Sequence, residues 1–234
     1  MGGNEYGQLG LGAADDDAHP TAARLAALGS GVVQVAVGGY YYGGFSAALT
    51  AGGEVYLWGS NWIGQLGDGT LHDRSNPTRI AALGTDTVQL ALGGEHALAL
   101  KQGGAVFSWG SGQYGQLGLG DTDNRLSPTE VTGLGTDNAY IAAQSLGGMA
   151  LKSDGRLFNW GSNGFNALGD GTTTTRLSPV ELAVGSDNAH VVGGQYHALL
   201  LKADGSVLSW GKNNLAQIGN GGTTHQVRFS LQRQ

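Results

Sequence analysis

Residues 94–128 carry the pattern that decides the fold: Gly-Glu-His-Ala-Leu-Ala-Leu at 94–100, Trp-Gly at 109–110, Gly-Gln-Leu-Gly at 115–118, and Pro128 ten residues further on. The same order of residues recurs along the chain. Trp-Gly pairs begin at spacings of 51, 51 and 50 residues, at Trp58, Trp109, Trp160 and Trp210. A repeat of this length must be identified first, because overlooking it would mis-assign the whole fold.

The other parts of the pattern keep the same spacing. Each Trp is followed by a variant of Gly-Gln-Leu-Gly, at Gly64-Gln65-Leu66-Gly67, Asn166-Ala167-Leu168-Gly169 and Ala216-Gln217-Ile218-Gly219, and an earlier copy stands at Gly7-Gln8-Leu9-Gly10. That earlier copy places Met1 at a Trp position. We therefore expect one propeller-repeat domain over residues 1–234, with repeats at 1–57, 58–108, 109–159 and 160–209 and a partial repeat at 210–234.

Each period contains about four short strands separated by glycine-rich turns. In the second copy, an apolar run ends at Leu92, a Gly pair follows, and an alternating strand covers residues 97–100. Two-residue turns come next in each copy, at Gly52-Gly53, Gly103-Gly104, Asp154-Gly155 and Asp204-Gly205. Such pairs tolerate the positive φ of a type I′ hairpin, so we predict that turn type here.

No apolar stripe with helical periodicity interrupts these strands. A single four-stranded sheet leaves apolar faces uncovered, whereas radial stacking of successive sheets buries them. The sequence thus predicts an all-β protein, a β-propeller of four-stranded antiparallel blades. The repeated residues Trp58, Trp109, Trp160 and Trp210 are predicted to form the core between blades.

The composition excludes several classes of function. The net charge is −6, which argues against a nucleic-acid partner, since binding phosphates requires a basic face. The chain has no Cys, which rules out disulfides and cysteine-based zinc sites. Residues 1–6 show no signal peptide, which favours a cytoplasmic location, and no apolar run approaches the roughly 20 residues of a membrane span.

The string from Gly94 to Pro128 resembles the regulator-of-chromosome-condensation repeat, and the resemblance covers nearly the whole chain. It implies a β-propeller, usually of seven blades. Seven such copies need roughly 357 residues, whereas this chain has 234. We expect an incomplete arc of about four and a half repeats that ends before its last blade is finished. Closure with fewer blades and pairing with another chain are the alternatives.

An open arc leaves sheet faces and strand edges uncovered. We therefore expect self-association through the open blade edges.

Recurring polar residues are interpreted as structural. His96 and His197 share one repeat position, and two His without a third ligand make a poor zinc site. We expect their rings to bond backbone in a turn of their own blade, rather than to serve as metal ligands or general bases. No catalytic residues, metal or cofactor are predicted.

Arginines recur in the same way, each three residues before a Pro, at Arg74, Arg125 and Arg176. We expect them to bond carbonyls of a neighbouring blade, although a ring of Arg could also bind an acidic partner. Aspartates in the glycine-rich turns, Asp68, Asp121 and Asp170, lack the spacing of a calcium loop and are interpreted as turn formers.

The irregular first copy is the main candidate for a binding site. It is 57 residues long, and four of its extra residues follow Gly39. Clustered aromatic side chains outside the core register give large contact area at low entropic cost. We therefore predict a partner-binding surface formed by Tyr40, Tyr41, Tyr42, Phe45 and Trp62. The alternative is that this insertion packs over the open first blade.

Three functions follow from these observations. The leading prediction is a non-catalytic protein-interaction module of the regulator-of-chromosome-condensation repeat type. The resemblance also implies guanine-nucleotide exchange on a Ran-like small GTPase for some members, although no long wedge-like insertion is present. A secreted enzyme inhibitor of the β-lactamase-inhibitor propeller type is the third possibility.

Overall fold

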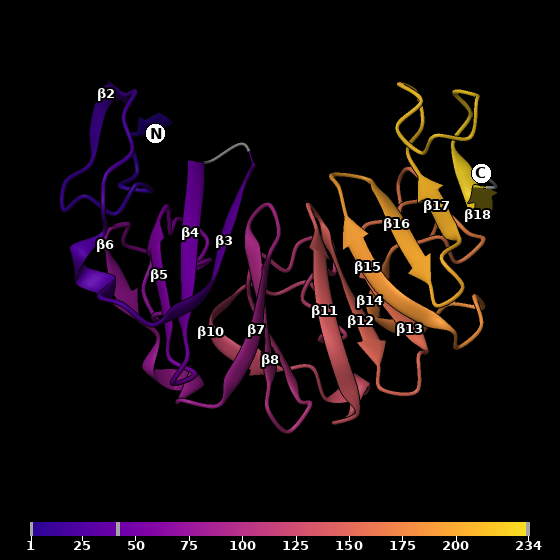
Figure 1. Cartoon of the computed structure of the whole chain (residues 1–234), viewed down its shortest axis with the longest axis horizontal. Coiled ribbons are helices and arrows are strands. Elements are labelled where there is room, and N and C mark those ends of the chain that lie inside the picture. The colour runs from indigo at the N-terminus through magenta and orange to yellow at the C-terminus, as the bar shows by residue number, and fades with distance from the viewer. Residues whose placement is uncertain (1, 41–42, 233–234) are drawn as a thin grey trace.

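The computed structural model describes residues 2–40 and 43–232, with the side chains of 226–232 left undescribed. Four sheets of four antiparallel strands and one two-stranded sheet follow one another along the molecule. They form an open arc in which the described ends of the chain lie at opposite ends of the long axis (Figure 1). The prediction of an incomplete β-propeller with four-stranded blades is confirmed.

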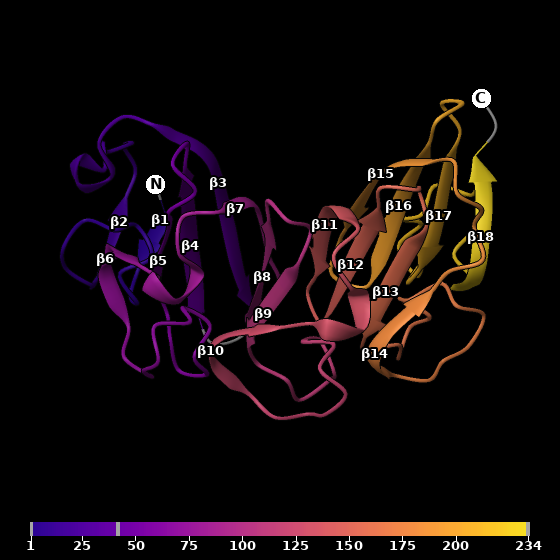
Figure 2. The same cartoon turned by 90° about the horizontal axis from the view of Figure 1, so that it is seen from below.

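Within each blade the strands are adjacent in chain order, and the blades line up side by side (Figure 2). A half-blade at the N-terminal end consists of β1 (Gly2–Asn4) and β2 (Asp15–His19). Blade 1 consists of β3 (Val32–Tyr40), β4 (Gly43–Thr50), β5 (Val55–Gly59) and β6 (Arg74–Arg79). Blade 2 consists of β7 (Thr87–Leu92), β8 (His96–Lys101), β9 (Val106–Gly110) and β10 (Arg125–Glu130).

The remaining blades repeat this plan. Blade 3 consists of β11 (Asn138–Gln144), β12 (Gly147–Lys152), β13 (Leu157–Gly161) and β14 (Arg176–Glu181). Blade 4 consists of β15 (Asn188–Gly193), β16 (His197–Lys202), β17 (Val207–Gly211) and β18 (Gln226–Gln232). Short 3-10 turns at Ala26–Leu28, Ala81–Leu83 and Thr132–Leu134 precede blades 1, 2 and 3. No helix in the described residues is long and apolar enough to cross a membrane.

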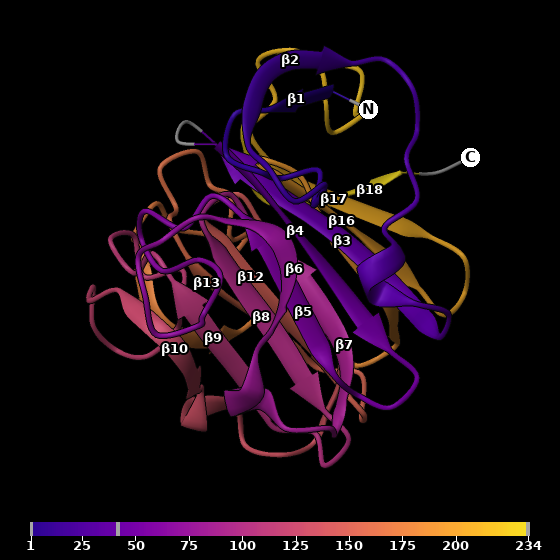
Figure 3. The ribbon, with the colours of Figure 1, turned by 90° about the vertical axis from the view of Figure 1, so that its left-hand side faces the viewer.

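Blades and sequence repeats are offset from each other. Each Trp is the next-to-last residue of the third strand of a blade, so the fourth strand of that blade belongs to the next sequence repeat. The expectation of an unfinished last blade is therefore wrong, because β18 pairs with β17 and completes blade 4. The incomplete unit is at the other end, where β1 and β2 pair with each other as a two-stranded sheet (Figure 3). By their place relative to Gly7-Gln8-Leu9-Gly10 in the repeat, they correspond to a third and a fourth strand.

The hairpins between second and third strands correct the predicted turn type. Only the second residue of each pair has positive φ, at Gly53, Gly104, Gly155 and Gly205. In blade 2 the Gly104 amide donates to the Lys101 carbonyl, and the Lys101 amide donates to the Ala105 carbonyl. This is a three-residue loop with a left-handed glycine at its end, not a two-residue type I′ turn.

Adjacent blades are joined by the repeated Trp and the loop of the preceding blade. The indole N–H of each Trp donates to the carbonyl at the Gln position of that loop: Trp58 to Gln8 at 2.9 Å, Trp109 to Gln65 at 3.0 Å, Trp160 to Gln116 at 2.9 Å and Trp210 to Ala167 at 3.0 Å. The final Gly of the same loop lies under the indole. A Cβ on Gly118 would come within 2.9 Å of the Trp160 ring. We call this contact the Trp lock.

The first strands of the blades are also joined by side-chain amides. Gln34 of β3 donates to the Leu90 carbonyl at 2.8 Å and accepts from the Leu90 amide at 2.9 Å. Gln89 of β7 makes the same pair of bonds with Ile141 of β11. These bonds set the separation of neighbouring blades along the inner side of the arc.

Both ends of the arc expose positions that are buried between blades elsewhere. Val35 of β3 is 72% exposed, whereas its counterparts Leu90, Ile141 and Val191 are 2%, 1% and 0% exposed. Leu199 and Leu201 of blade 4 are likewise exposed, while Leu98 and Leu100 of blade 2 are buried. Self-association through these faces stays a prediction.

The Trp lock predicts a position-specific cost of adding a methyl group. Gly118 and Gly219 have φ of 70° and 69°, but only Gly118 lies against a Trp ring, and a Cβ on Gly219 would meet nothing within 4 Å. Both G118A and G219A should lose about 1–2 kcal/mol from the left-handed backbone. G118A should lose a further ~1–3 kcal/mol from overpacking. Urea denaturation measures both, and equal losses would contradict the lock.

The open face of blade 1 predicts the behaviour of the chain in solution. Val35→Glu combined with Val37→Glu places two carboxylates among exposed valines of β3, so it should reduce self-association by burying charge at any contact there. Static light scattering over a concentration series measures the mass. A wild-type chain that is monomeric at all concentrations would contradict the expected association.

Candidate functional site

One side of the arc collects most of the irregular chain. In every blade the first and third strands run in parallel, so the turn after the first strand and the loop after the third strand lie at the same side. We call this side the loop face. It consists of residues 5–14, 60–73, 111–124, 162–175 and 212–225 together with the turns at 93–95, 145–146 and 194–196.

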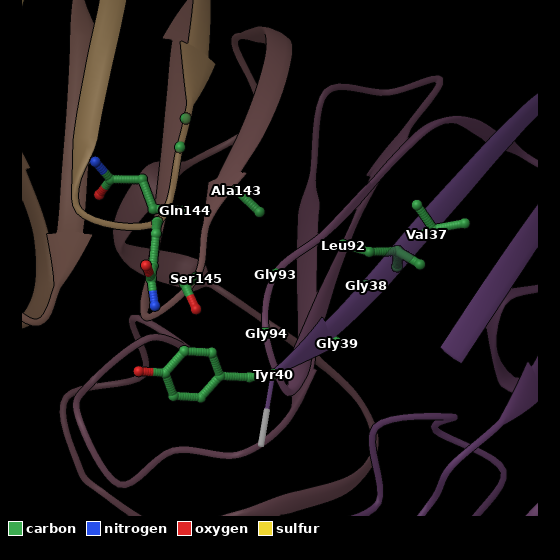
Figure 4. Close-up of a pocket in the computed structure, with 13 residues that line it drawn as sticks. Val37, Gly38, Gly39, Tyr40, Leu92, Gly93, Gly94, Ala143, Gln144 and Ser145 are labelled. Carbon is green, nitrogen blue, oxygen red and sulfur yellow. The ribbon is translucent and has the colours of Figure 1, made fainter. Parts of the chain in front are cut away.

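A hollow of about 770 Å³ opens where the first strands of all four blades end. Its wall is largely backbone, because glycines stand at most of these strand ends (Figure 4). Neighbouring blades are bonded along this wall: the Gly39 amide donates to the Gly93 carbonyl, and the Gly94 amide donates to the Ser145 carbonyl. The hollow therefore has a fixed backbone frame with few side chains.

The extra residues of the first copy lengthen the hairpin of β3 and β4. These strands have 9 and 8 residues, whereas β7 and β8 have 6 each. At the end of β3, Tyr40 lies beside the hollow (Figure 4). Its hydroxyl is 2.8 Å from the Tyr196 hydroxyl of blade 4, so the hairpin reaches across the inner side of the arc. Tyr41 and Tyr42 lie outside the described residues.

Phe45 does not belong to an exposed surface. It is 1% exposed and lies in the core of blade 1, with its ring over Gly38. The expectation that it contacts a partner directly is therefore corrected. At this pair of facing positions on the first and second strands, one residue is large and the other is Gly. In blades 1, 2 and 4 a ring of the second strand lies over a Gly at the end of the first, whereas in blade 3 the large residue is Gln144 of the first strand and the Gly is Gly147 of the second.

His96 occupies the Phe45 position in blade 2. It is fully buried, and neither ring nitrogen has a hydrogen-bond partner among the described residues. Burial lowers the pKa of His96 to about 4, and the Gly147 backbone of blade 3 opposes that shift only partly. The expected bond to backbone of its own blade is absent there. The ring is held chiefly by packing, and the backbone group that acts on it, Gly147, belongs to blade 3. The pKa of His197 is also lowered by burial.

Trp62 lies on the loop face with 60% of its surface exposed. The edge of its ring meets Tyr6 with the centroids 6.3 Å apart. Further exposed apolar side chains occur on the same face, at Leu71, Tyr114, Phe165 and Leu215. Sequence reasoning identified Trp62 but missed the others, although the residue before the Gly-Gln-Leu-Gly segment is apolar in every copy.

The repeated Arg residues pair with the repeated Asp residues of their own loop. Arg74 bonds Asp68, Arg125 bonds Asp121 and Arg176 bonds Asp170, at 2.6–2.8 Å. The expectation that these Arg bond carbonyls of a neighbouring blade is thus wrong. Hydrogen bonds from Thr70 and Arg74 outweigh burial and keep the pKa of Asp68 below its usual value, and Asp170 is held in the same way.

Buried lysines on the opposite side of the blades were not predicted. Lys101, Lys152 and Lys202 end the second strands and donate to the carbonyls of Leu83, Leu134 and Val184 in the preceding turns. Each also pairs with an Asp, at Asp86, Asp137 and Asp187. Their spacing of 51 and 50 residues is the signal that would have found them.

Blade 4 carries a cation among aromatic rings on the loop face. The Lys212 ammonium lies 4.8 Å from the Phe165 ring centroid and 5.3 Å from that of Tyr196. His225 packs edge-on against Phe165 with centroids 5.8 Å apart. Within the described part of the chain, no three His, Asp or Glu side chains are grouped so as to hold a metal ion.

Comparisons with known proteins agree with this architecture. A family model described as the RCC1-like domain matches residues 1–233. The ultraviolet-B receptor UVR8 of Arabidopsis thaliana is 36% identical over 185 residues, which are 77% of this chain and 40% of UVR8.

Two solved structures share the arrangement of blades. Human WBSCR16 superimposes with a TM-score of 0.87 at 27% identity, over 100% of this chain and 62% of that one. Yeast RCC1 (Prp20), solved bound to Kap60, gives a TM-score of 0.74 at 26% identity, over 88% of this chain and 51% of that one. The chain spans less than two thirds of each of these three proteins.

The burial of His96 predicts a pH dependence of stability. Its pKa is about 4 in the folded chain and 6.5 in an unfolded one. Between these values the unfolded chain binds more protons, so stability falls as pH drops from 6.5 to 4, by about 3 kcal/mol in full. H96F, which copies Phe45, should remove this loss in urea denaturation at pH 7.5 and pH 4. A slope unchanged from wild type would contradict the account, and H72Q at an exposed His is the control.

Proposed function

We propose, starting from the fact that this chain belongs to the RCC1-like domain family, that it is a non-catalytic protein-interaction module that binds its partner through the loop face. The exposed apolar side chains on that face carry the proposal. Clusters of such side chains on a folded surface mark contact sites for other proteins. Aromatic side chains are the residues that most often dominate binding energy in such contacts.

The exposed side chains stand on tips that the fold holds rigidly. In blade 1 the Asn61 amide donates to the Thr70 and His72 carbonyls at 3.0 Å, and its oxygen accepts from the Leu66 amide at 2.9 Å. Asn163 and Asn213 close the loops of blades 3 and 4 with the same bonds. Loops that are already ordered lose little entropy on binding, which supports a recognition role.

Repetition spreads the apolar tips over a wide surface. Trp62, Tyr114, Phe165 and Leu215 come from four successive loops, so a partner could touch several blades at once. Tyr40, at the inner edge of this surface, remains a proposed contact together with Tyr41 and Tyr42, which lie outside the described residues. A flat contact over several blades suits a folded protein better than a small molecule, which requires an enclosed pocket.

Guanine-nucleotide exchange on a Ran-like small GTPase is the second candidate. The likeness to yeast Prp20 favours it, since Prp20p has been characterised for its binding to Gsp1p and histones. The loop face here has only a short extra hairpin at β3 and β4, whose strands have 9 and 8 residues. Accelerated release of labelled GDP from a Ran-type GTPase by this chain would place exchange above simple binding.

The loop face can be tested by substitution. The immobilised triple variant W62A/Y114A/L215A should capture at least about tenfold less partner than the immobilised wild-type chain. It removes exposed apolar contacts and leaves the core unchanged. V88A is the matched control, since Val88 is an exposed apolar residue at the opposite end of its blade. Y40A/Y41A/Y42A tests the three tyrosines separately. Equal capture by the triple variant and wild type would exclude the loop face.

A further inference from the structure

Glu95 is a buried acid on the loop face. It precedes β8 in blade 2 and is 8% exposed. Its carboxylate forms no ion pair or hydrogen bond with any described residue, although its oxygens are not among the fully enclosed unpaired atoms. A carboxylate in such a place is costly unless it has a partner. Burial raises its pKa, with no opposing charge nearby to lower it.

The internal repeat shows what fills the same place in blade 4. In blades 2 and 4 the residue after the Trp-Gly pair donates its amide to the carbonyl of the residue before the second strand: Ser111 to Glu95 at 2.9 Å, and Lys212 to Tyr196 at 2.8 Å. Glu95 therefore corresponds to Tyr196, and Ser111 corresponds to Lys212. In blade 4 the chain's own ammonium lies over Tyr196. In blade 2 a carboxylate stands in place of the Tyr196 ring and a serine in place of Lys212, so blade 2 has no cation of its own at this position.

Two other buried polar atoms of blade 2 also lack partners. The Ser111 hydroxyl and the Gln116 amide nitrogen are buried without a hydrogen bond among the described residues. In blade 1 the counterparts of these two groups bond each other, Gln65 to Ser60 at 3.2 Å. Buried polar groups without partners are rare in folded proteins, and each requires an explanation. Here Ser111 lies next to Glu95, because its amide donates to the Glu95 carbonyl, and Gln116 follows in the same loop.

We propose that Glu95 receives the cationic side chain of a Lys or Arg from the protein that binds the loop face. This inference rests on the proposed function and names the chemistry of the partner. A partner's cation would lie beside Glu95 in blade 2, as the Lys212 ammonium lies beside the corresponding Tyr196 in blade 4. Tyr40, whose Cβ lies 3.1 Å from the Cβ position of Gly94, provides an aromatic ring at the rim.

The unpaired charge of the loop face fits a basic partner. The three loop arginines are paired with Asp, whereas Glu5, Asp73 and Asp123 join Glu95 outside any ion pair in the described part of the chain. Lys212 opposes them. A basic segment of a partner would thus meet unpaired negative charge on the loop face, which favours association.

A titration with a short probe tests the inference on the whole chain. Acetyl-Gly-Arg-Gly-amide should cause saturable NMR shifts at the backbone amides of Glu95 and Ser111, and the same peptide with citrulline in place of Arg should not. E95Q keeps the shape and removes the charge, so the Kd should rise about tenfold or more. S111K supplies an internal cation, as Lys212 does in blade 4, and should raise the Kd of the Arg peptide to a similar extent.

E5Q is the matched control, because it removes one unpaired charge from the same face. Three results would each overturn the inference: equal effects of E5Q and E95Q on the Kd, equal binding of the Arg and citrulline peptides, or no saturable shift at Glu95 and Ser111. Circular dichroism confirms that E95Q and S111K stay folded. Lost capture by W62A/Y114A/L215A without Arg binding would refute only the Glu95 site. Arg binding with unchanged capture would refute only the proposed loop-face function.

Discussion

The contact between each repeated Trp and the loop of the preceding blade is the constraint on which the rest of the structure depends. A four-stranded blade cannot bury both of its faces, so it is stable only against a neighbour. The indole bond to a loop carbonyl fixes how far and at what angle the next blade lies. The glycine beneath the ring must lack a side chain for that approach, as at Gly118.

The same contact creates the candidate site. A loop that holds the Trp of the next blade must fold back over it, and its tip then projects on one side of the arc with an apolar residue exposed, as at Tyr114 and Leu215. The turns after the first strands lie on that side too, including Glu95 and Tyr196. The proposed binding groups thus collect on a face that the packing of blades keeps rigid. The opposite side holds the buried Lys–Asp pairs and serves stability.

Sequence predicted the blades well because the repeat records the packing contacts directly. The spacing of Trp58, Trp109, Trp160 and Trp210 identified the strands and the core, and the family assignment agrees. Details set by three-dimensional neighbours were missed. Arg74 pairs within its own loop, Phe45 is buried although it sits in an irregular segment, and the hairpins use one left-handed glycine. Glu95 could be recognised only from the structure, which shows that it is buried without a partner among the described residues and that its counterpart in blade 4, Tyr196, lies beside Lys212.

Hydrogen exchange of the five Trp indole N–H groups, followed by NMR, tests the central contact most directly. Trp109, Trp160 and Trp210 are fully buried and bonded to loop carbonyls, and Trp58 is nearly so. The account predicts slow exchange at these four, limited by separation of blades, and fast exchange at the exposed Trp62. Exchange of Trp109 or Trp160 as fast as that of Trp62 would contradict it.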